Sequence, residues 1–296
     1  MFRNQVKSFT TWTFCGILTA FGATLSCTLQ PSNEEAKPLQ KKIVSLHPAI
    51  TESIYALEKQ NLLAGRSDYC KVPKATESLT PLGTSLTPNF EAIARTQPTL
   101  VLTDRAAGTP IKQLEKIVAT RQLPWLTRED VRDSILVLGS VVGAENKAKK
   151  LSSKIYQALE SKTSSTSPRM LVLMASSDIE KGQIWFIRHN SLHGAAIEAA
   201  GFNNAAPRNL KGPPQMSLEQ LLRQDPQIIL FLPAKRVSRE EEQALVKSLD
   251  MLPDLQAVRG NSIGVLNGNN LMGAGPNITA LVSLIRAVGL SVLDSK

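Results

Sequence analysis

The chain has 296 residues, of which 42% are hydrophobic and 20% are charged, proportions typical of a globular protein long enough for two ordinary domains. It carries 34 Lys and Arg against 25 Asp and Glu, a net charge of +9, which suits an anionic ligand, a nucleic acid or an anionic membrane surface. The basic residues are scattered, without a zinc-finger spacing or an aromatic-interleaved basic motif. Nucleic-acid binding is therefore not expected.

The first residues are typical of a bacterial export signal. Arg3 and Lys7 precede an apolar stretch that ends in small residues just before Cys27. This layout predicts a signal peptide over residues 1–27 and a lipid on Cys27, although Thr24 stands where a lipoprotein signal usually has leucine. An ordinary cleaved signal and an uncleaved anchor helix are the alternatives. We expect a protein of the periplasm or the cell surface, anchored to the membrane by its lipid.

Residues 28–41 have two prolines, several charges and little apolar content, so they predict a flexible tether. Cys15 lies within the signal and Cys27 would carry the lipid, which leaves Cys70 alone in the folded part. No disulfide is therefore expected to hold the fold.

From residue 42 the sequence alternates between predicted strands and helices. The first lobe contains a strand IVSL, a helix PAITESIYALEKQ, a strand LLAGRS, a loop and helix TDRAAGTPIKQLEKIVATRQ, and a short strand LPWL. The alternation predicts an N-terminal β/α lobe over residues 42–127, and the same pattern predicts a C-terminal β/α lobe over residues 168–296. Between them, residues 128–163 have apolar positions at helical spacing, interrupted only by Gly139 and Gly143.

That spacing predicts one long linker helix. The expected architecture is α/β, with two β/α lobes joined by this helix and the ligand cleft between them. Because a helical joint is stiff, the cleft should open only a little.

One segment occurs in both lobes. NFEAIARTQPTLVL, residues 89–102, returns as SLEQLLRQDPQIIL, residues 217–230. In each copy a glutamate, Glu91 or Glu219, precedes a proline by seven positions. Each copy predicts a short helix, a proline break and a buried strand. The repeated unit indicates two related lobes.

Five motifs follow one another along the chain: KIVSLHPAITESIYAL, AGRSDYCKVP, LGTSLTPNFEAIARTQPTLVL, MSLEQLLRQDPQIIL and GPNI. Over residues 42–290 the chain resembles the cobalamin and ferric-siderophore binding proteins of bacterial ABC importers. The resemblance implies a periplasmic or lipid-anchored receptor without a resident cofactor. Such a receptor binds a small chelate or macrocycle and delivers it to a transmembrane permease dimer with its ATPase.

In that family a glutamate of each lobe docks into arginine-rich pockets of the permease, and Glu91 and Glu219 match these positions. A carboxylate near a helix N-terminus is favoured by the helix dipole and pairs well with arginine. The alternative is that each glutamate only caps its own helix. A receptor that signals rather than transports is a further alternative.

Ligands of α/β lobes bind beyond the carboxyl ends of the strands. The loops expected there hold the candidate ligand contacts: His47, Arg66, Tyr69, Leu86, Arg105, Phe186, Arg188, His189 and Asn267. The resemblance implies that Tyr69 and Phe186 pack against a ring of the ligand. Vitamin B12 receptors place a tryptophan in each of two facing loops, where this chain has Leu86 and Pro213. Corrinoid and ferric-siderophore ligands are therefore about equally expected, with haem third.

The three histidines lie next to strand ends. A metal interpretation would take His47 together with His189 or His193, with Tyr69 available for haem iron. A local structural role is the alternative for His193, which opens a predicted helix. Bare Zn or Mn needs three or four converging ligands, which the spacing does not require, so no metal site is predicted. The sequence has no nucleophile motif or phosphate-binding loop, and an enzyme is not expected.

Overall fold

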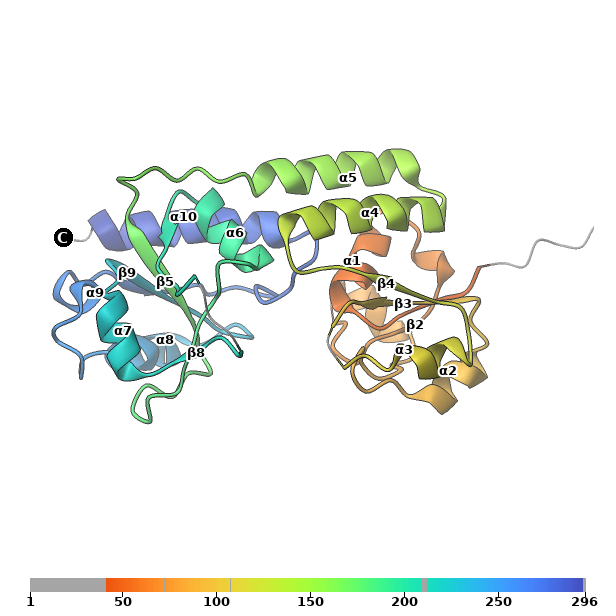
Figure 1. Ribbon diagram of the computed structural model, residues 1–296, viewed down its shortest axis with the longest axis horizontal. Helices are drawn as coiled ribbons and strands as arrows, with labels where there is room; N and C mark the ends of the chain where they lie inside the picture. The colour runs from red at the N-terminus through yellow and green to blue at the C-terminus, as the bar shows by residue number, and fades with distance from the viewer. Residues whose placement is uncertain (1–40, 72, 107, 209–211, 295–296) are drawn as a thin grey trace, which may run out of the picture. The chain divides into compact units, whose positions relative to one another are not determined.

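The computed structural model describes most of the chain, namely residues 41–71, 73–106, 108–208 and 212–294. They form two four-stranded sheets flanked by helices, together with a small two-stranded ribbon (Figure 1). The predicted signal peptide, Cys27, and all of the predicted tether except Lys41 lie outside the described residues. Within the described ranges, none of the helices combines the length and apolar character needed to cross a membrane.

The first sheet is parallel throughout, with strand order β2-β1-β3-β4. Its elements are β1 (Ile43–Ser45), α1 (Pro48–Ala56), η1 (Gln60–Leu62), β2 (Leu63–Arg66), η2 (Lys74–Ser78), α2 (Phe90–Thr96), β3 (Leu100–Asp104), α3 (Ile111–Glu115) and β4 (Thr120–Leu123). Val44 and Val101, on the two inner strands, are fully buried. Because strands of a parallel sheet are buried on both faces, they usually have continuous apolar sequences, as the strands of this lobe do.

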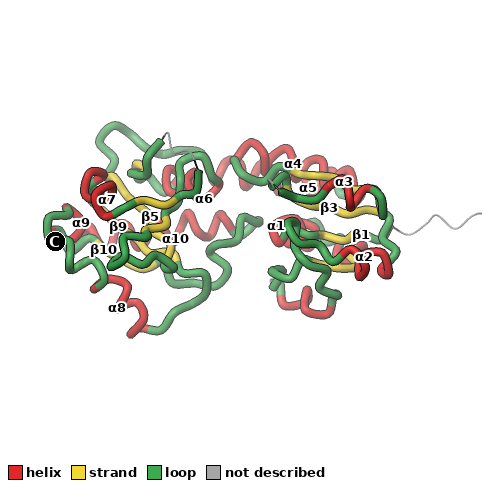
Figure 2. Tube along the Cα trace, turned by 60° about the horizontal axis from the view of Figure 1, so that its bottom comes forward, coloured by secondary structure: helices red, strands yellow, loops and turns green. Residues whose placement is uncertain are grey.

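The second sheet is also parallel, with strand order β10-β9-β5-β7. The elements of this lobe are β5 (Arg169–Met174), β6 (Ile184–Trp185), α6 (Leu192–Ala199), β7 (Asn203–Asn204), β8 (Gln215–Met216), α7 (Leu218–Gln224), β9 (Ile228–Leu232), α8 (Arg239–Lys247), α9 (Gln256–Arg259), β10 (Ile263–Val265) and α10 (Ile278–Asp294). β6 and β8 form the antiparallel ribbon. Figure 2 shows the strands of both sheets lying between helices. The expected α/β class with two lobes is confirmed.

The repeated segment has the same local structure in both lobes. Asn89 and Ser217 cap the N-termini of α2 and α7 through their side chains. Both helices end in a left-handed residue, Gln97 with φ 48° and Asp225 with φ 39°, and a proline follows each. The strands that come next, β3 and β9, are inner strands of their sheets. The predicted order of helix, proline break and buried strand is present twice.

The segment between the lobes differs from the prediction of one long helix. It forms two helices, α4 (Arg128–Val142) and α5 (Glu145–Ala158). Gly143 ends α4 in the left-handed conformation, with φ 65° and ψ 52°, which is the usual role of glycine after a helix. The helical spacing was correctly recognised, but the reversal of direction at Gly143 was missed.

The two helices pack against each other along their length as an antiparallel pair. A Cβ added at Gly139 would lie 2.2 Å from the Cβ of Ala148, so the glycine permits a close approach. Further along the pair, Ser152 Oγ donates a hydrogen bond of 2.9 Å to the Arg132 carbonyl. The apolar positions of residues 128–163 therefore serve contact between two helices as well as contact with the lobes.

The segment between β10 and α10 belongs to the second lobe and forms hydrogen bonds with the first. Both lobes belong to one compact unit, Gln40–Lys296. Trp125 Nε1 donates a hydrogen bond of 2.8 Å to the Ala274 carbonyl. Asn270 Nδ2 donates one of 3.0 Å to Glu52 Oε1 on α1. We call residues 268–277 the strap, because they join the second lobe to side chains of the first.

Candidate ligand-binding site

The loops that follow β1, β2 and β3 gather at the carboxyl edge of the first sheet, where the sequence predicted ligand contacts. Asp68 ties together two parts of the long connection between β2 and α2: its backbone N–H donates to the Gly83 carbonyl at 2.9 Å, and its Oδ1 accepts from the Gly83 N–H at 3.0 Å. Tyr69, beside this contact, is 72% exposed, and Leu86 is 52% exposed. A large aromatic and a large aliphatic side chain are thus both presented to solvent by tied loops.

The loop that carries Tyr69 is fixed from several sides. Arg66 Nε donates to the Thr76 carbonyl at 2.8 Å and its NH1 to the Ser67 carbonyl at 3.0 Å. Cys70 is buried, and its Sγ contacts Thr51 Oγ1 at 3.1 Å. Burial is the main reason that the pKa of the Cys70 thiol is raised. Arg66 therefore supports the loop through its guanidinium, while Tyr69 remains available to a ligand.

Arg105 follows β3 and is exposed, with no hydrogen bond or ion pair of its side chain among the described residues. A Cβ added at Gly108, three residues later, would lie 3.8 Å from Leu86 Cδ2. The Arg105 loop and the Leu86 turn therefore lie side by side. Arg105 is the free cation closest in sequence to this contact.

His47 lies at the start of α1, after β1. Its ring is tilted by 45° against that of Trp125, with the centroids 6.2 Å apart. Its Nδ1 is buried and has no hydrogen-bond partner among the described residues. Burial lowers the pKa of His47, and the negative charge of Asp104 partly opposes this shift. A neutral imidazole beside a buried tryptophan is suited to packing more than to binding an anion.

The predicted contacts after β6 lie elsewhere. Phe186 bridges to Leu173 in the antiparallel sense, and the Ile187 N–H donates to the Val172 carbonyl at 2.9 Å. The chain therefore runs from the carboxyl end of β5 back toward its amino end. Phe186 was expected beyond the carboxyl end of a strand, and the structure corrects this, because its segment pairs with β5 in the antiparallel sense. Phe186 is 1% exposed within the core, so its ring is not available to a ligand.

Arg188 and His189 are carried further in the same direction, to the amino edge of the second sheet. Arg188 donates to the Gly212 carbonyl at 2.6 Å. His189 Nε2 donates to the Ala206 carbonyl at 2.9 Å, and its Nδ1 lies 3.5 Å from Glu198 Oε1. His189 therefore lies at the amino edge of its sheet, whereas His47 lies at the carboxyl edge of the other, and the pairing of these two as metal ligands is not supported.

His193, in the first turn of α6, has the local role that was the alternative to metal binding. Its Nε2 donates to the Leu271 carbonyl of the strap at 3.1 Å, and burial lowers its pKa. Among the residues that the structure describes, His, Cys, Asp and Glu side chains form no group of three or more that could hold a metal ion.

Asn267, after β10, is at the expected edge of its sheet, but its amide is used within the fold. Its Nδ2 donates to the Val237 carbonyl at 2.9 Å, and its Oδ1 accepts from the Val237 N–H at 3.1 Å. A third contact joins Nδ2 to Glu242. Asn267 therefore holds the loop after β9 against α8.

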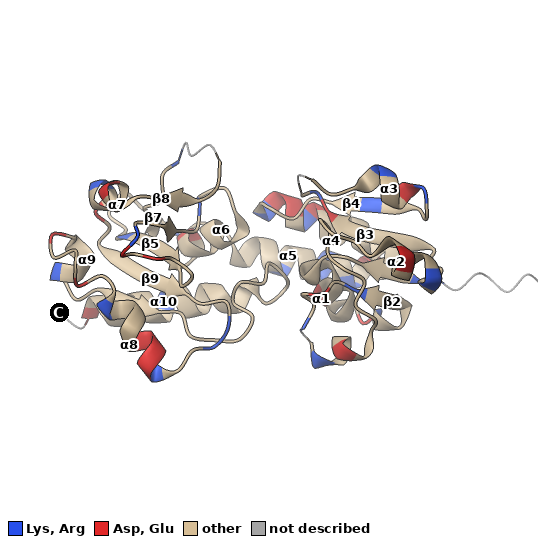
Figure 3. Ribbon diagram, turned by 90° about the horizontal axis from the view of Figure 1, so that it is seen from below, with Lys and Arg blue, Asp and Glu red and all other residues tan. Residues whose placement is uncertain are grey.

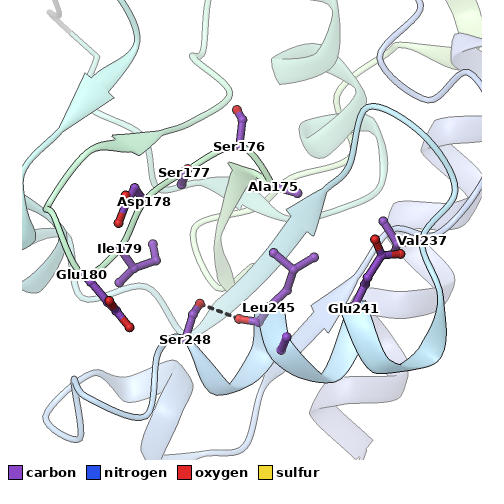
Figure 4. Close-up of a pocket in the computed structure, with 11 residues that line it drawn as sticks. Ala175, Ser176, Ser177, Asp178, Ile179, Glu180, Val237, Glu241, Leu245 and Ser248 are labelled. Atoms are coloured by element: carbon purple, nitrogen blue, oxygen red, sulfur yellow. Dashed lines mark hydrogen bonds between the residues drawn. The ribbon is translucent and has the colours of Figure 1, made fainter.

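One hollow at the carboxyl edge of the second sheet was not expected from the sequence, and it lies beside the loop that follows β5. A cavity of about 600 Å³ lies between this loop and α8 (Figure 4), and it is lined by Ala175, Ser176, Ser177, Asp178, Ile179, Glu180, Val237, Glu241, Ala244, Leu245 and Ser248. Met174 ends β5 at the carboxyl edge of the sheet. The sequence could have indicated this loop, because ligands bind beyond the carboxyl ends of parallel strands and β5 is such a strand.

Glu91 and Glu219 occupy the same position of α2 and α7, the second residue of each helix. Their side chains are 82% and 78% exposed. Among the described residues, each forms an ion pair only with the arginine one turn later, at 3.7 Å from Arg95 and 3.3 Å from Arg223. Both helices show acidic residues at the surface in Figure 3.

Neither glutamate caps its helix. In α2 the Asn89 side chain accepts from the Ala92 N–H at 3.0 Å. In α7 Ser217 and Gln220 form a reciprocal capping box. The capping alternative is therefore wrong for both residues, whose exposed carboxylates form ion pairs at the surface of their own helices.

Comparison with known proteins places the chain in a family. A model of the periplasmic binding protein family matches residues 43–268. The high-affinity heme uptake system protein IsdE of Staphylococcus aureus (strain MRSA252) is 23% identical over 248 residues, which cover 80% of this chain and 83% of that protein.

Solved structures share the fold. The heme-binding protein HutB of Vibrio cholerae has a TM-score of 0.69 and 20% identity, with coverage of 84% of this chain and 98% of HutB. The vitamin B12 binding protein BtuF of the same species has a TM-score of 0.67 and 22% identity, with coverage of 85% and 97%. The family match spans both sheets and the helices between them, so the chain belongs to the periplasmic binding protein family, as an extracytoplasmic substrate-binding component of an ABC importer.

Proposed function

We propose that this receptor captures haem and delivers it to the permease of its importer. The observation that carries the proposal is the exposed phenol of Tyr69, held on a fixed loop at the carboxyl edge of the first sheet. Among the described residues no hydrogen bond engages its hydroxyl. Tyrosine is one of the side chains that bind haem iron in proteins.

The neighbours of Tyr69 suit the rest of such a ligand. Leu86 offers an exposed apolar surface to a macrocycle. Arg105 is a free cation beside the Leu86 turn, and guanidinium groups pair with carboxylates such as haem propionates. An oxygen ligand, an apolar surface and a cation near one another suit a ferric tetrapyrrole with carboxylates.

Haem, which the sequence analysis placed third, is favoured over a corrinoid. The two tryptophans of vitamin B12 receptors are replaced by Leu86 and Pro213. IsdE and HutB are both named as heme proteins. A ferric siderophore already surrounds its iron with its own oxygen atoms, so it would use Tyr69 only for packing.

Delivery is proposed to use Glu91 and Glu219 as a docking pair for arginines of the permease. Support comes from their equivalent positions, their exposure and the capping of both helices by other residues. We also propose that a lipid on Cys27 holds the receptor at the membrane, as the layout of the first residues predicts.

The test is an absorbance titration with haemin, comparing the parent with Tyr69→Phe. Loss of the phenol should move the absorbance bands and weaken binding by at least tenfold. The matched control is Tyr156→Phe, because Tyr156 packs under Arg128 and Arg132 on the helix pair and should leave the spectrum unchanged. Binding of cyanocobalamin or a ferric catecholate without haemin binding would contradict the proposal, as would a Tyr69→Phe spectrum identical to the parent's.

A further inference from the structure

The outer surface of α5 carries a group of lysines. Lys149, Lys150 and Lys154 are exposed, and no ion pair engages them among the described residues. Together with Ser153 and Gln157 they line a shallow hollow of about 720 Å³. We call these three lysines the lysine face.

The charges around the lysine face do not neutralise it. α5 has an acidic residue only at its start, Glu145, and the next one, Glu160, follows its end. Glu58 is engaged by Lys147 on the same helix. The opposite side of α5 is buried against its neighbours through Ala148, Ser152 and Ile155. The helix therefore presents a cationic surface to solvent, and close packing fixes its orientation.

The chain enters the folded part at this end of the helix pair. Lys41 Nζ donates a hydrogen bond of 2.6 Å to the Val141 carbonyl, next to the last residue of α4. Val141 precedes the first residue of α5 by four positions. Any anchor carried by the preceding residues is thus attached beside the turn between α4 and α5.

The distances are compatible with a contact between this surface and the membrane. Residues 28–41 number fourteen and can reach at most about 50 Å when extended. α5, with 14 residues, is about 21 Å long. A lipid on Cys27 would therefore keep the whole lysine face within reach of the headgroups.

We propose that the lysine face docks on anionic phospholipid headgroups while the receptor is not engaged with the permease. The surface is separate from the glutamates of α2 and α7, whose negative charge is repelled by the same lipids. This inference rests on the proposed lipid anchor, which would keep the lysine face near the membrane, and it does not depend on which solute the receptor binds. Each lysine near an anionic surface contributes about fivefold to partitioning, so three contribute about 100-fold.

The test uses the protein from Cys27 onward, coupled through this cysteine to a maleimide lipid in vesicles. Cys70 is buried, so coupling is directed to Cys27. Tethered protein should lie flat on vesicles with 30% phosphatidylglycerol and stand free on pure phosphatidylcholine, as read by fluorescence transfer from α5 to labelled lipid. Untethered protein should partition to the anionic vesicles, and 1 M salt should abolish this, because it shortens the Debye length to about 3 Å.

The decisive variant is Lys149→Glu/Lys150→Glu/Lys154→Glu, which should lower partitioning to anionic vesicles by about 100-fold or more. Its control is Lys112→Glu/Lys116→Glu/Lys247→Glu, which makes the same charge change at exposed positions of the α3 and α8 regions. The control should change partitioning by less than fivefold, and both variants should unfold at the parent's temperature.

Two outcomes would overturn the proposal. Equal losses in both variants would mean that net charge, rather than the lysine face, attracts the lipid. Binding to soluble polyglutamate without binding to anionic vesicles would assign the face to an acidic macromolecule instead of the membrane. A failure of haemin binding in the other titration would leave these results unaffected, so the two proposals fail separately.

Discussion

Glu52 provides a test of how the two lobes are held together. The residue is buried, with an exposed fraction of 7%. Oε1 accepts from Asn270 of the strap, while Oε2 is buried without a partner among the described residues. A Cβ added at Gly275 would lie 2.1 Å from Oε2, so the strap backbone is pressed against the carboxyl group. Desolvation raises the pKa of Glu52, and the bond from Asn270 partly opposes this.

The direction of the pH effect follows from the raised pKa. A carboxyl group whose pKa is higher in the folded state contributes stability that is fully present below the unfolded pKa, about 4.3, and is lost as pH rises through the folded pKa. Glu52→Gln keeps the size of the side chain and the acceptor for Asn270 but cannot ionise. An unsatisfied buried polar group costs about 1–3 kcal/mol, and more when charged. The parent should therefore lose about 1 kcal/mol or more of stability between pH 4.5 and pH 8 that the variant, which has no charge to desolvate, retains.

Urea unfolding of both proteins between pH 4.5 and 8 measures this difference. Glu58→Gln is the control, because the Glu58 side chain is 72% exposed and its pKa is lowered by Lys147, so any effect should have the opposite pH dependence. A difference in stability between Glu52→Gln and the parent that stayed constant from pH 4.5 to 8 would mean that the pKa of Glu52 is not raised in the folded state, and it would refute the prediction. The thiol of Cys70, whose pKa is raised in part by Glu52, should titrate at lower pH in the variant.

Three further results are expected. Reversing Glu91 and Glu219 to lysine should abolish delivery of the solute while changing its affinity less than twofold, because both side chains are exposed and belong to capped helices; equal losses in uptake assays and in calorimetry would contradict docking. Gly143→Ala should lower the free energy of unfolding by about 1–2 kcal/mol, because a left-handed conformation is strained for alanine; Gly182→Ala, also at positive φ but in the loop after β5, compares a strained site outside the helix pair. Cys27→Ser should release the protein from membranes, and unchanged fractionation would exclude a lipid at that residue.

The predictability of the fold differs between its parts. Buried strands such as β3 and β9 were recognisable because parallel strands need apolar runs on both faces. The helix pair was not, because Gly139 and Gly143 interrupt the pattern in the same way whether the helix bends or reverses. Whether the helix bends or reverses depends on the surface against which it packs. The contact between Gly139 and Ala148 helps to hold the reversed helix, but an alanine in the sequence does not indicate such a contact.

The site was predictable to the extent that strand direction was. Tyr69, Leu86 and Arg105 follow parallel strands, and the structure places them at one edge of the first sheet. Phe186 belongs to a segment that runs antiparallel to β5, and His189 follows it. The apolar sequence of a short strand does not indicate whether the strand is parallel or antiparallel to its neighbour. Long-range contacts such as the hydrogen bond from Trp125 to Ala274 could not be predicted, because the two residues are far apart in the sequence and belong to no common pattern.

Comparison of the two copies of the repeated unit distinguishes residues that stabilise the fold from residues available to a partner. Asn89 in α2 and Ser217 with Gln220 in α7 satisfy the first-turn amides by different means, yet the second residue of both helices is an exposed glutamate. Folding needs a cap but does not require a particular one, and an exposed ion pair with the arginine one turn later contributes only about 0–1 kcal/mol. The residues that cap the helix can therefore differ between the copies without loss of the fold. The shared glutamate contributes little to either helix, which is the physical reason to assign it to a partner that contacts both lobes.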